Sequence, residues 1–537
     1  MSQNRFLQRL NDRFEHEPER LFARFWQGDE RHDLTYGELS RRVGAHARAW
    51  SAAGVQAGDI VFIILPHGPD QMSAFLAAMW IGAVPSFLPG PNVRQDADLY
   101  WRAHERVFAR TQASALLTEP ALAHEIAAKI SGGSGLSVLT PVHADLWTKA
   151  AAPVEIAEDA PALLQHSSGT TGLKKGVVLT YHAIVEQLEA YGPAVGLDEN
   201  SRIASWLPLY HDMGLVACFL LPLYSGAQLE SLDAFAWVSR PVLLLEAIET
   251  AGATHCWLPN FAFAHLARAV SPAAKHDLSS MRCWIGCSEP NRPETFEAFI
   301  ERFDVPPNTL SASYAMAETV FAVSQSGGQA APLHLQIAVE NGRALPATGV
   351  GSIRLISNGR LLPGVEIAIL QNGLLHREEG VVGEICVRTP FDFHGYFAAE
   401  TPVAKVDGLF RTGDSGFIQN GEVFVLGRLK DLIIVNGRNF HATDIETAMH
   451  DVSGVKPGRC VALGVDNALT GSQQIVIVAE SEGAAGPDVS SINRALLAAF
   501  GVPAAAVKIV PPGWICKSTA GKIARSDNLS KYLAEFV

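Results

Sequence analysis

Long hydrophobic runs are missing from this sequence. Its longest apolar stretch, Met213 to Tyr224, contains Pro222 and is well short of the roughly 20 residues that a membrane-spanning helix needs. The N-terminus has no apolar signal core either, because Arg5 and Arg9 interrupt it. We therefore expect a protein without a membrane span that works in the cytoplasm.

An excess of positive charge and paired cysteines are also missing. The chain has 42 lysines and arginines against 55 aspartates and glutamates, a formal net charge of −13, whereas a nucleic-acid binder normally presents a basic face. Its seven cysteines form no Cys-x-x-Cys pair, and Cys283 and Cys287 have no histidine at zinc-finger spacing. These features argue against a nucleic-acid partner and a thiolate metal site, and they suit a reducing cytoplasm.

What the chain does have is length and a repeating pattern. With 537 residues, 48% of them hydrophobic, it is too long for one core and predicts two or more domains. Buried strands alternate with helical patterns, which predicts an α/β fold of parallel sheets with helices on both faces. The expected strands, each followed by a helical pattern, are Ile60 to Leu65, Ala83 to Leu88, Ala115 to Thr118, Ala162 to Gln165, Arg202 to Trp206, His255 to Leu258 and Arg282 to Ile285.

The pattern changes toward the C-terminus. From about Thr348, short strands with tight turns predict a β-rich subdomain, including a hairpin at Asn420-Gly421. Beyond Lys430 a smaller α+β unit follows. We predict a large N-terminal domain over residues 1–428, made of two sheet-and-helix layers plus the β-rich subdomain at about 348–428, then a hinge at 429–431 and a small mobile C-terminal domain over 432–537.

The loop that follows the predicted strand at Gln165 has the composition of a phosphate site. Glycines let backbone N–H groups face an anion, hydroxyls add donors, and a lysine supplies charge. The loop is not a Walker A motif, because the one Gly-Lys pair of the chain, Gly521-Lys522, lacks that motif's first glycine. The candidate phosphate-binding residues are Ser167, Ser168, Gly169, Thr170, Thr171, Gly172 and Lys175.

This loop resembles the signature of the adenylate-forming superfamily, which comprises acyl- and aryl-CoA synthetases, adenylation domains of peptide synthetases and firefly-type luciferases. Further segments resemble the other motifs of that superfamily, in the same order. They are Ser313-Tyr314-Ala315-Met316-Ala317-Glu318-Thr319 for adenine and magnesium, Arg411-Thr412-Gly413-Asp414 for ribose, Gly427-Arg428-Leu429-Lys430-Asp431 for the hinge, and Lys517-Ser518-Thr519-Ala520-Gly521-Lys522 for the catalytic lysine.

The resemblance implies a role for each motif in joining ATP to a carboxylate. For the phosphates and the metal, it assigns the β- and γ-phosphates to Thr170, Thr171 and Lys175, and Mg²⁺ to Glu318 and Thr170. For the nucleoside, it assigns ribose to Asp414 and Arg428, and adenine to Tyr314, Ala315, Met316, Ala317 and the turn with Gly286, Ser288, Glu289 and Pro290. Lys522 would bridge the carboxylate and the α-phosphate, and Lys430 would be the hinge. Taken singly, each also has a structural explanation: Asp414 as a turn former, Arg428 as a surface ion pair, Lys430 as a linker lysine.

Several segments resemble the fatty acyl-AMP ligases in particular: Trp206 to Gly214, Pro259 to Phe263, and Gly427 to Asn439. Extra sequence between Ala331 and Asn358 resembles the insertion of that branch, and this resemblance implies a carrier-protein acceptor in preference to CoA. Apolar residues dominate around these motifs, as an acyl chain requires. The candidate acyl-pocket residues are Trp206, His211, Asp212, Met213, Gly214, Asn260 and Phe261, with His211 either in the core or at the pocket entrance.

The expected activity is ATP- and Mg²⁺-dependent activation of a medium or long fatty acid, or a similar apolar carboxylic acid, to an acyl-adenylate. Pyrophosphate leaves, and the acyl group passes to the phosphopantetheine thiol of a separate acyl carrier protein. Three alternatives stay open: an acyl-CoA synthetase with CoA as acceptor, an enzyme that activates aryl or amino acids, and an inactive nucleotide-binding scaffold. The segment His441-Ala442-Thr443, where Tyr-Pro is usual, leaves the acceptor in question.

Overall fold

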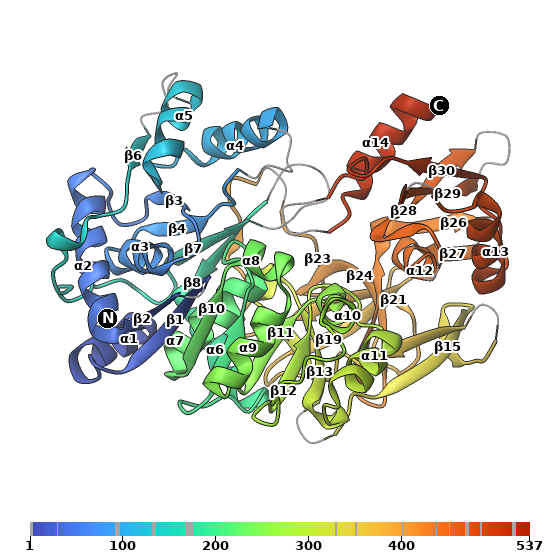
Figure 1. Cartoon of the computed structure of the whole chain (residues 1–537), viewed down its shortest axis with the longest axis horizontal. Coiled ribbons are helices and arrows are strands. Elements are labelled where there is room, and N and C mark those ends of the chain that lie inside the picture. The colour runs from blue at the N-terminus through green and yellow to red at the C-terminus, as the bar shows by residue number, and fades with distance from the viewer. Residues whose placement is uncertain are drawn as a thin grey trace.

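The computed structural model describes residues 4–28, 30–91, 97–130, 136–166, 175–327, 330–349, 352–399, 402–435, 438–450, 452–467, 472–483, 486–517 and 522–537. It has a large N-terminal domain and a small C-terminal domain, coloured red in Figure 1. The expected α/β class with a separate C-terminal α+β domain is confirmed.

The largest sheet runs through the middle of the large domain. Its order is β18 (Arg360–Leu361), β14 (Ala322–Gln325), β13 (Leu310–Ala315), β12 (Cys283–Gly286), β11 (His255–Leu258), β9 (Arg202–Ser205), β10 (Gln228–Leu232), β1 (Leu21–Gln27) and β2 (Glu30–Thr35). The strands from β13 to β1 pair in parallel, while β18, β14 and β2 add antiparallel edges. Parallel strands end at a common edge, so the loops after β11, β12 and β13 meet there.

Two further sheets complete the N-terminal part. One is parallel, in the order β4 (Val84–Phe87), β3 (Ile60–Ile64), β5 (Ala115–Thr118) and β6 (Ser137–Leu139); the other is antiparallel, in the order β22 (Gly395–Tyr396), β8 (Gly176–Thr180) and β7 (Pro161–His166). One expectation is wrong here. A helix does not follow the strand at 162–165; antiparallel β8 does, because Val177 and Val178 are β-branched and favour an extended chain.

Helices cover the sheets of the large domain, as Figure 1 shows. They are α1 (Arg5–His16), α2 (Tyr36–Ala52), α3 (Pro69–Trp80), α4 (Ala97–Thr111), α5 (Pro120–Ile130), α6 (Tyr181–Ala194), α7 (Leu221–Ser225), α8 (Ala234–Ser239), α9 (Val242–Ala251), α10 (Asn260–Ala269) and α11 (Pro293–Phe303). Their starts follow local chemistry: the Thr35 hydroxyl, for example, accepts the Glu38 backbone N–H at 3.2 Å and caps α2.

Short strands form the β-rich part. One sheet has the order β20 (Leu374–His376), β19 (Glu366–Gln371), β21 (Gly383–Arg388), β24 (Leu409–Gln419) and β23 (Lys405–Val406), with β25 (Glu422–Arg428) paired to β24. The hairpin at Asn420-Gly421 is confirmed, with positive φ at both residues. The extra sequence forms a sheet of its own, β16 (Arg343–Pro346), β15 (His334–Glu340) and β17 (Ile353–Ile356), so short strands begin before Thr348.

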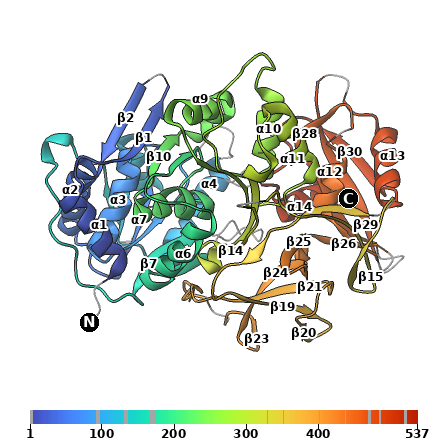
Figure 2. The ribbon, with the colours of Figure 1, turned by 90° about the horizontal axis from the view of Figure 1, so that it is seen from below.

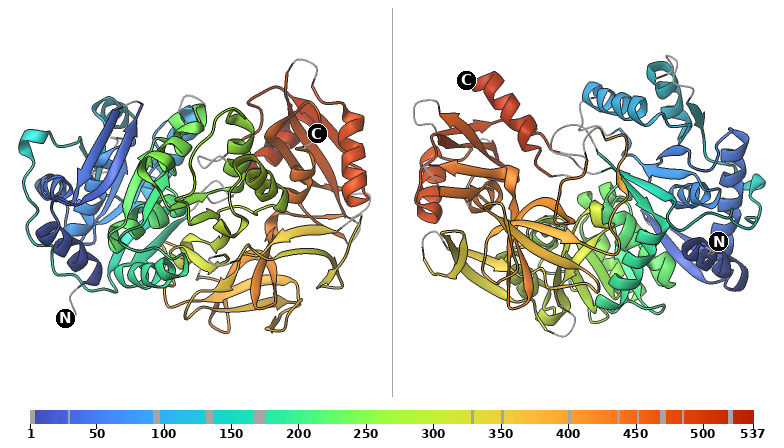
Figure 3. Two further views of the ribbon diagram at one scale, coloured as in Figure 1. Left: turned by 60° about the horizontal axis from the view of Figure 1, so that its bottom comes forward. Right: turned by 180° about the vertical axis from the view of Figure 1, so that it is seen from behind.

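The C-terminal domain has its own core. Its strands are β26 (Leu432–Val435), β27 (Arg438–His441), β28 (Val455–Asn467), β29 (Ser472–Ser481) and β30 (Ala506–Val510), and its helices are α12 (Ala442–Ala448), α13 (Val489–Phe500) and α14 (Arg525–Phe536). Ile445, Ile477 and Leu496 are fully buried between these elements. Both views of Figure 3 place this domain and the β-rich strands at the end of the molecule opposite the N-terminus. Nowhere in the described ranges is a helix both long and apolar enough to cross a membrane.

Candidate functional site

The candidate phosphate loop lies between β7 and β8. Its residues Ser167, Ser168, Gly169, Thr170, Thr171 and Gly172 lie outside the described part of the chain. Lys175, at the end of the loop, holds its Nζ 4.6 Å from the ring centroid of Tyr396. Tyr396 belongs to β22, which pairs with β8. The exposed lysine of the loop therefore makes a cation–π contact with a residue far along the chain.

Glu318 lies in a 3₁₀ turn, Ala317–Thr319, beside the same tyrosine. Its Oε1 accepts the Tyr396 hydroxyl at 2.7 Å, and its carbonyl accepts the Phe393 backbone N–H at 2.9 Å. Burial and the Glu318 charge raise the pKa of Tyr396, so its hydroxyl stays a donor. An oriented carboxylate near a phosphate loop fits Mg²⁺, which in proteins takes one or two carboxylates and completes its shell with phosphates and water.

Tyr314, Asp414 and Arg428 form one connected group. The Tyr314 hydroxyl donates to Asp414 Oδ2 at 2.7 Å, and Arg428 Nε lies 2.8 Å from Asp414 Oδ1. Asp414 and Arg428 are cross-strand partners in the β24–β25 hairpin, whereas Tyr314 comes from β13 in the large sheet. Burial raises the pKa of Asp414, and the charge of Arg428 acts against that rise. Asp414 is therefore a buried hydrogen-bond acceptor, 5% exposed, bonded to Tyr314 of the large sheet.

The residues after Tyr314 continue this surface. Ala315 is half-buried, while Met316 and Ala317 are buried. The Met316 backbone N–H donates to the Phe321 carbonyl at 2.9 Å, which fixes the chain on the way to Glu318. The adenine candidates of this motif and the metal candidate are thus held in one short, well-bonded turn.

The turn after β12 approaches the same place. A Cβ at Gly286 would lie 2.2 Å from Asn291 Oδ1, so a larger residue there would displace the Asn291 side chain. Ser288 has a φ of 72°, in the left-handed region. Glu289 Oε1 accepts the Phe261 backbone N–H at 2.6 Å, which attaches the turn to the start of α10.

Two further candidates belong to this turn. Pro290 is half-buried, and Asn260 Oδ1 accepts the Arg292 backbone N–H at 3.0 Å, a second bond between the turn and α10. Burial raises the pKa of Glu289, against the effect of the Phe261 hydrogen bond and of the Lys522 charge. The turn is therefore attached to α10 by two hydrogen bonds and carries a half-buried carboxyl group.

The loop after β9 supplies an aromatic wall. The Trp206 ring stacks on Trp237 of α8 with 3.8 Å between centroids and 6° between planes. Phe261 lies 6.1 Å from Trp206, and 43% of it is exposed whereas both tryptophans are buried. A buried aromatic pair with an exposed phenyl edge can receive an apolar group.

The same loop leads into a π-helical segment, Met213–Leu220, of a kind often found at functional sites. The Asp212 side chain accepts the Met213 backbone N–H at 2.8 Å and lies 3.4 Å from His211 Nδ1. Burial acts to raise the pKa of Asp212, but His211 and Lys522 outweigh it, so the pKa is lowered. Gly214 permits the tight entry, since a Cβ there would lie 2.3 Å from the Pro208 carbonyl oxygen.

Lys522 reaches this site from near the end of the chain. Its charge acts on Asp212, Glu289 and Asp414, which belong to three separate segments of the large domain. It is half-buried. The charge of the candidate catalytic lysine therefore acts on candidate residues of the large domain.

Other cations gather at the same edge. Burial lowers the pKa of Lys430, and the charges of Arg428 and, more weakly, Lys175 lower it further, with Asp431 and Asp414 acting against them. Neighbouring cations repel one another and disfavour their own charged forms. A polyanion such as ATP would relieve that repulsion, so the residues fit a nucleoside triphosphate bound with Mg²⁺.

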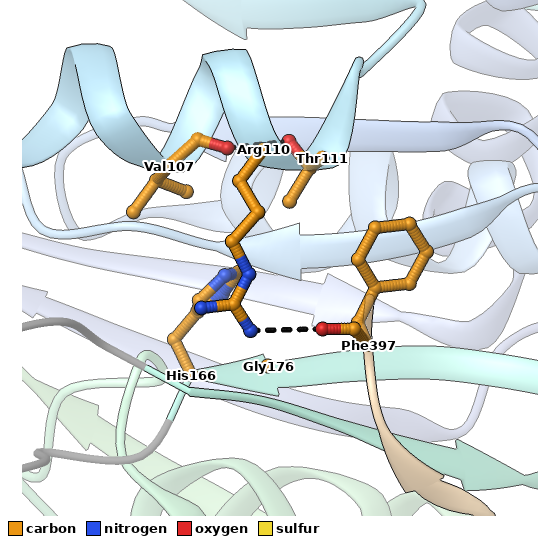
Figure 4. Close-up of a pocket in the computed structure, with 6 residues that line it drawn as sticks. All are labelled: Val107, Arg110, Thr111, His166, Gly176 and Phe397. Atoms are coloured by element: carbon orange, nitrogen blue, oxygen red, sulfur yellow. Dashed lines mark hydrogen bonds between the residues drawn. The ribbon is translucent and has the colours of Figure 1, made fainter. Parts of the chain in front are cut away.

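A small pocket lies beside His166 and Gly176, the ends of β7 and β8. It is lined by Val107, Arg110, Thr111, His166, Gly176 and Phe397 (Figure 4). Arg110 of α4 donates to the Phe397 carbonyl at 2.8 Å. This bond ties α4 to the residue after β22, and thus supports the strand that carries Tyr396.

The structure also adds residues that no motif indicated. Tyr396 contacts both Lys175 and Glu318, Trp237 stacks on Trp206, and Arg292 bonds to the C-terminal domain through Asp444. Each is separated from its partner by a long stretch of chain, so local spacing carried no signal. A tyrosine beside a short strand, or a tryptophan in an apolar helix, looks like an ordinary core residue.

A comparison with known proteins identifies the class. Residues 10–397 match the family model described as AMP-binding enzyme, and the chain belongs to that family. Within it, the chain is similar to fatty acyl-AMP ligases, as its motifs indicated.

The similarity extends over nearly the whole chain. The long-chain-fatty-acid–AMP ligase FadD26 of Mycobacterium tuberculosis is 28% identical over 547 residues, covering 94% of this chain and 92% of that protein. The medium-chain-fatty-acid–[acyl-carrier-protein] ligase JamA of Moorena producens is 30% identical over 548 residues, covering 95% and 92%. A structure from a study of fatty acyl-adenylate ligases of E. coli and L. pneumophila superposes with a TM-score of 0.88 at 25% identity, covering 99% of this chain and 98% of that one.

Proposed function

We propose that this protein is a fatty acyl-AMP ligase that works in the cytoplasm. It joins a medium- or long-chain fatty acid to the AMP part of ATP and then passes the acyl group to the phosphopantetheine thiol of an acyl carrier protein. In the first step a carboxylate oxygen forms a bond to the α-phosphorus, and the bond from that phosphorus to pyrophosphate breaks. In the second step the thiol attacks the acyl carbonyl, and AMP leaves.

The observation that carries the proposal is the convergence around Asp414. Its carboxylate is bonded to Tyr314 and Arg428 and feels the charges of Lys430 and Lys522, so parts of the large domain, hinge and C-terminal domain share one site. A reaction between two anions needs such a cluster of positive charge. The names of FadD26 and JamA, an AMP ligase and a carrier-protein ligase for fatty acids, support the same substrate and acceptor.

In this proposal each side chain has a defined task. Lys175 and the loop before it hold the β- and γ-phosphates, and Glu318 binds Mg²⁺ together with Thr170 of that loop. Adenine lies between Tyr314 and the turn of residues 286–290, with the ribose hydroxyls on Asp414. Lys522 bridges the carboxylate and the α-phosphate, and Mg²⁺ held by Glu318 would supply the positive charge that the departing pyrophosphate needs. Lys430 is the residue about which the C-terminal domain turns.

The aromatic wall supports the choice of acid. The acyl chain lies along Trp206 and Phe261, beside the segment that contains His211, Asp212, Met213 and Gly214, with Asn260 at the start of α10. An apolar chain is suited to this wall because burying it beside aromatic rings is favourable. The separate sheet formed by β15, β16 and β17 is where the carrier-specific branch has its insertion, which supports a carrier acceptor rather than CoA.

A product analysis tests the proposal. The purified protein is incubated with ATP, Mg²⁺ and fatty acids of increasing length, with CoA, with a phosphopantetheinylated carrier protein, or with neither. We expect acyl-AMP to persist in the presence of CoA and to be consumed by the carrier, and mass spectrometry of the products measures both. Conversion of acyl-AMP to acyl-CoA would instead identify an acyl-CoA synthetase, and absence of any acyl-AMP would remove the proposed activity.

Removal of the metal gives a second prediction. Chelation by EDTA is expected to lower fatty-acid-dependent pyrophosphate release at least about a hundredfold, because it removes the metal ion that would neutralise the charge on the leaving pyrophosphate. Added Mg²⁺ should restore the rate in the unmodified protein. In Glu318→Gln, half-saturation should need a much higher Mg²⁺ concentration. A Glu318→Gln variant with an unchanged Mg²⁺ dependence would show that Glu318 is not the metal ligand.

A further inference from the structure

An ion pair joins the two domains on the side of the turn after β12. Arg292, at the start of α11, donates from its guanidinium to Asp444 Oδ1 in the first turn of α12. Figure 2 shows α11 and α12 as neighbours where the C-terminal domain meets the large domain. The two side chains are only 10% and 9% exposed, so the pair is withdrawn from water.

Arg292 directly follows the turn after β12, for which we propose a role in binding adenine. Its backbone N–H is held by Asn260 Oδ1 at 3.0 Å, and Glu289, three residues earlier, is held by the Phe261 N–H at 2.6 Å. The position of Arg292 is therefore tied to the turn that we assign to adenine. A side chain fixed at its base can dictate where its partner lies.

The helix that carries Asp444, α12, is held within the C-terminal domain by ion pairs. Two residues further on, Glu446 is bonded to Arg525 at 2.6 Å, and Arg525 is also bonded to Asp431 at 2.7 Å. Arg525 begins α14, three residues after Lys522. The helix that carries Asp444 is thus linked by ion pairs both to the hinge and to the segment that follows Lys522.

We propose that the Arg292–Asp444 pair is a latch that holds the C-terminal domain in the orientation that presents Lys522 for adenylate formation. The proposal rests on the proposed function, because it assumes that the domain must later turn for acyl transfer. The pair can exist only while α12 lies against α11, and in that arrangement the charge of Lys522 acts on Asp212, Glu289 and Asp414.

The energetics of a buried ion pair suit a latch. Attraction between two buried charges is largely offset by the cost of removing them from water, so such a pair adds little net stability but strongly selects one geometry. When the domain turns, both groups regain water and the opening is not prohibitive. Removing one partner only, by contrast, leaves a buried charge uncompensated and disfavours the closed arrangement. The pair therefore selects an orientation without locking it permanently.

The test combines kinetics with a distance measurement. In Asp444→Asn we expect acyl-AMP formation to slow roughly tenfold, the size of a typical coupling, while transfer from supplied acyl-AMP to the carrier stays within about twofold. Spin labels on cysteines placed at two exposed positions, Lys275 of the large domain and Leu497 of α13, report the domain arrangement. We expect one main distance in the otherwise unmodified protein and a broader distribution in Asp444→Asn.

Three comparison variants separate a latch from general damage. Asp33→Asn breaks an exposed pair with Arg24 within the large domain and should change neither the rate nor the distances. Arg292→Lys keeps the positive charge and should retain most of the adenylation rate and the main spin-label distance. Arg292→Gln combined with Asp444→Asn should be no slower than Asp444→Asn alone, because the two residues act as one unit.

The outcomes are distinguishable. An Asp444→Asn protein with the unmodified distance distribution would overturn the latch, even if its activity fell. Equal slowing of adenylate formation and transfer would also overturn it, since a latch affects only the first. If the unmodified protein made no acyl-AMP, the proposed function would fail, whereas the distance measurement would still decide whether the pair sets the domain arrangement.

Discussion

Lys522→Met is expected to lower the rate of acyl-adenylate formation by about two to three orders of magnitude, as happens when one preorganised charge at a transition state is removed. The charge of Lys522 acts on Asp212, Glu289 and Asp414, which are carboxylates of three separate segments of the large domain. Methionine retains most of the length and the apolar stem of the side chain and removes only the ammonium group. Fatty-acid-dependent exchange of radiolabelled pyrophosphate into ATP measures the rate.

The matched control is Lys275→Met, which removes an exposed lysine of the large domain and should leave exchange unchanged. A second assay supplies preformed acyl-AMP and carrier protein. Lys522→Met should keep most of its transfer rate there, because the lysine acts at the α-phosphate in the first step. Undiminished exchange in Lys522→Met would contradict the mechanism, and an equal loss in both assays would indicate damage to the fold.

Asp414→Asn is expected to raise the KM for ATP roughly ten- to hundredfold, because hydrogen bonds to a charged group contribute about 1.5–3 kcal/mol. The buried carboxylate is held by Tyr314 and Arg428, and its replacement keeps the shape but removes the charge. Pyrophosphate exchange at saturating fatty acid, measured over a range of ATP concentrations, gives the KM. Asp33→Asn, which removes an exposed carboxylate paired with Arg24, should leave the KM unchanged.

The pKa of Asp414 gives the same prediction a pH dependence. Burial raises this pKa, so the carboxyl is charged above the raised value and loses its charge as the pH falls through it. In the unmodified protein, ATP affinity should therefore begin to fall at a higher pH than an ordinary aspartate would cause. Asp414→Asn should lack that step. An identical pH profile in both proteins would show that Asp414 does not contact the nucleotide in its ionised form.

Much of the fold was predictable because its signals are local. The hairpin at Asn420-Gly421 follows from two residues that accept positive φ, and a buried strand such as Ile60–Ile64 follows from a continuous apolar run. The prediction of a helix after the strand at 162–165 was wrong, because the sequence of a strand does not indicate whether a helix or a second strand comes next. Only the pairing of Val177 with Gln165 shows that a hairpin forms.

The residues of the candidate site also fall into those that the sequence could indicate and those that it could not. Its motif residues, among them Glu318, Asp414 and Lys522, could be chosen from residue type and order along the chain. Their partners could not: Tyr396 is 78 residues from Glu318, and Asp444 is 152 residues from Arg292. Such contacts depend on the packing of separate elements, and the sequence around either residue does not indicate the other.

By itself, the sequence determined the class of reaction, because the chemistry of phosphate, carboxylate and metal requires particular residue types in short, ordered segments. Only the tertiary structure decided how those segments are placed relative to one another. It shows which tyrosine contacts both Lys175 and Glu318, that Arg292 pairs with Asp444 of α12, and that the charge of Lys522 acts on Asp414. The physical reason is that a motif's chemistry belongs to its own residues. The relative placement of motifs, by contrast, is set by burial and ion pairing summed over elements distant in the chain.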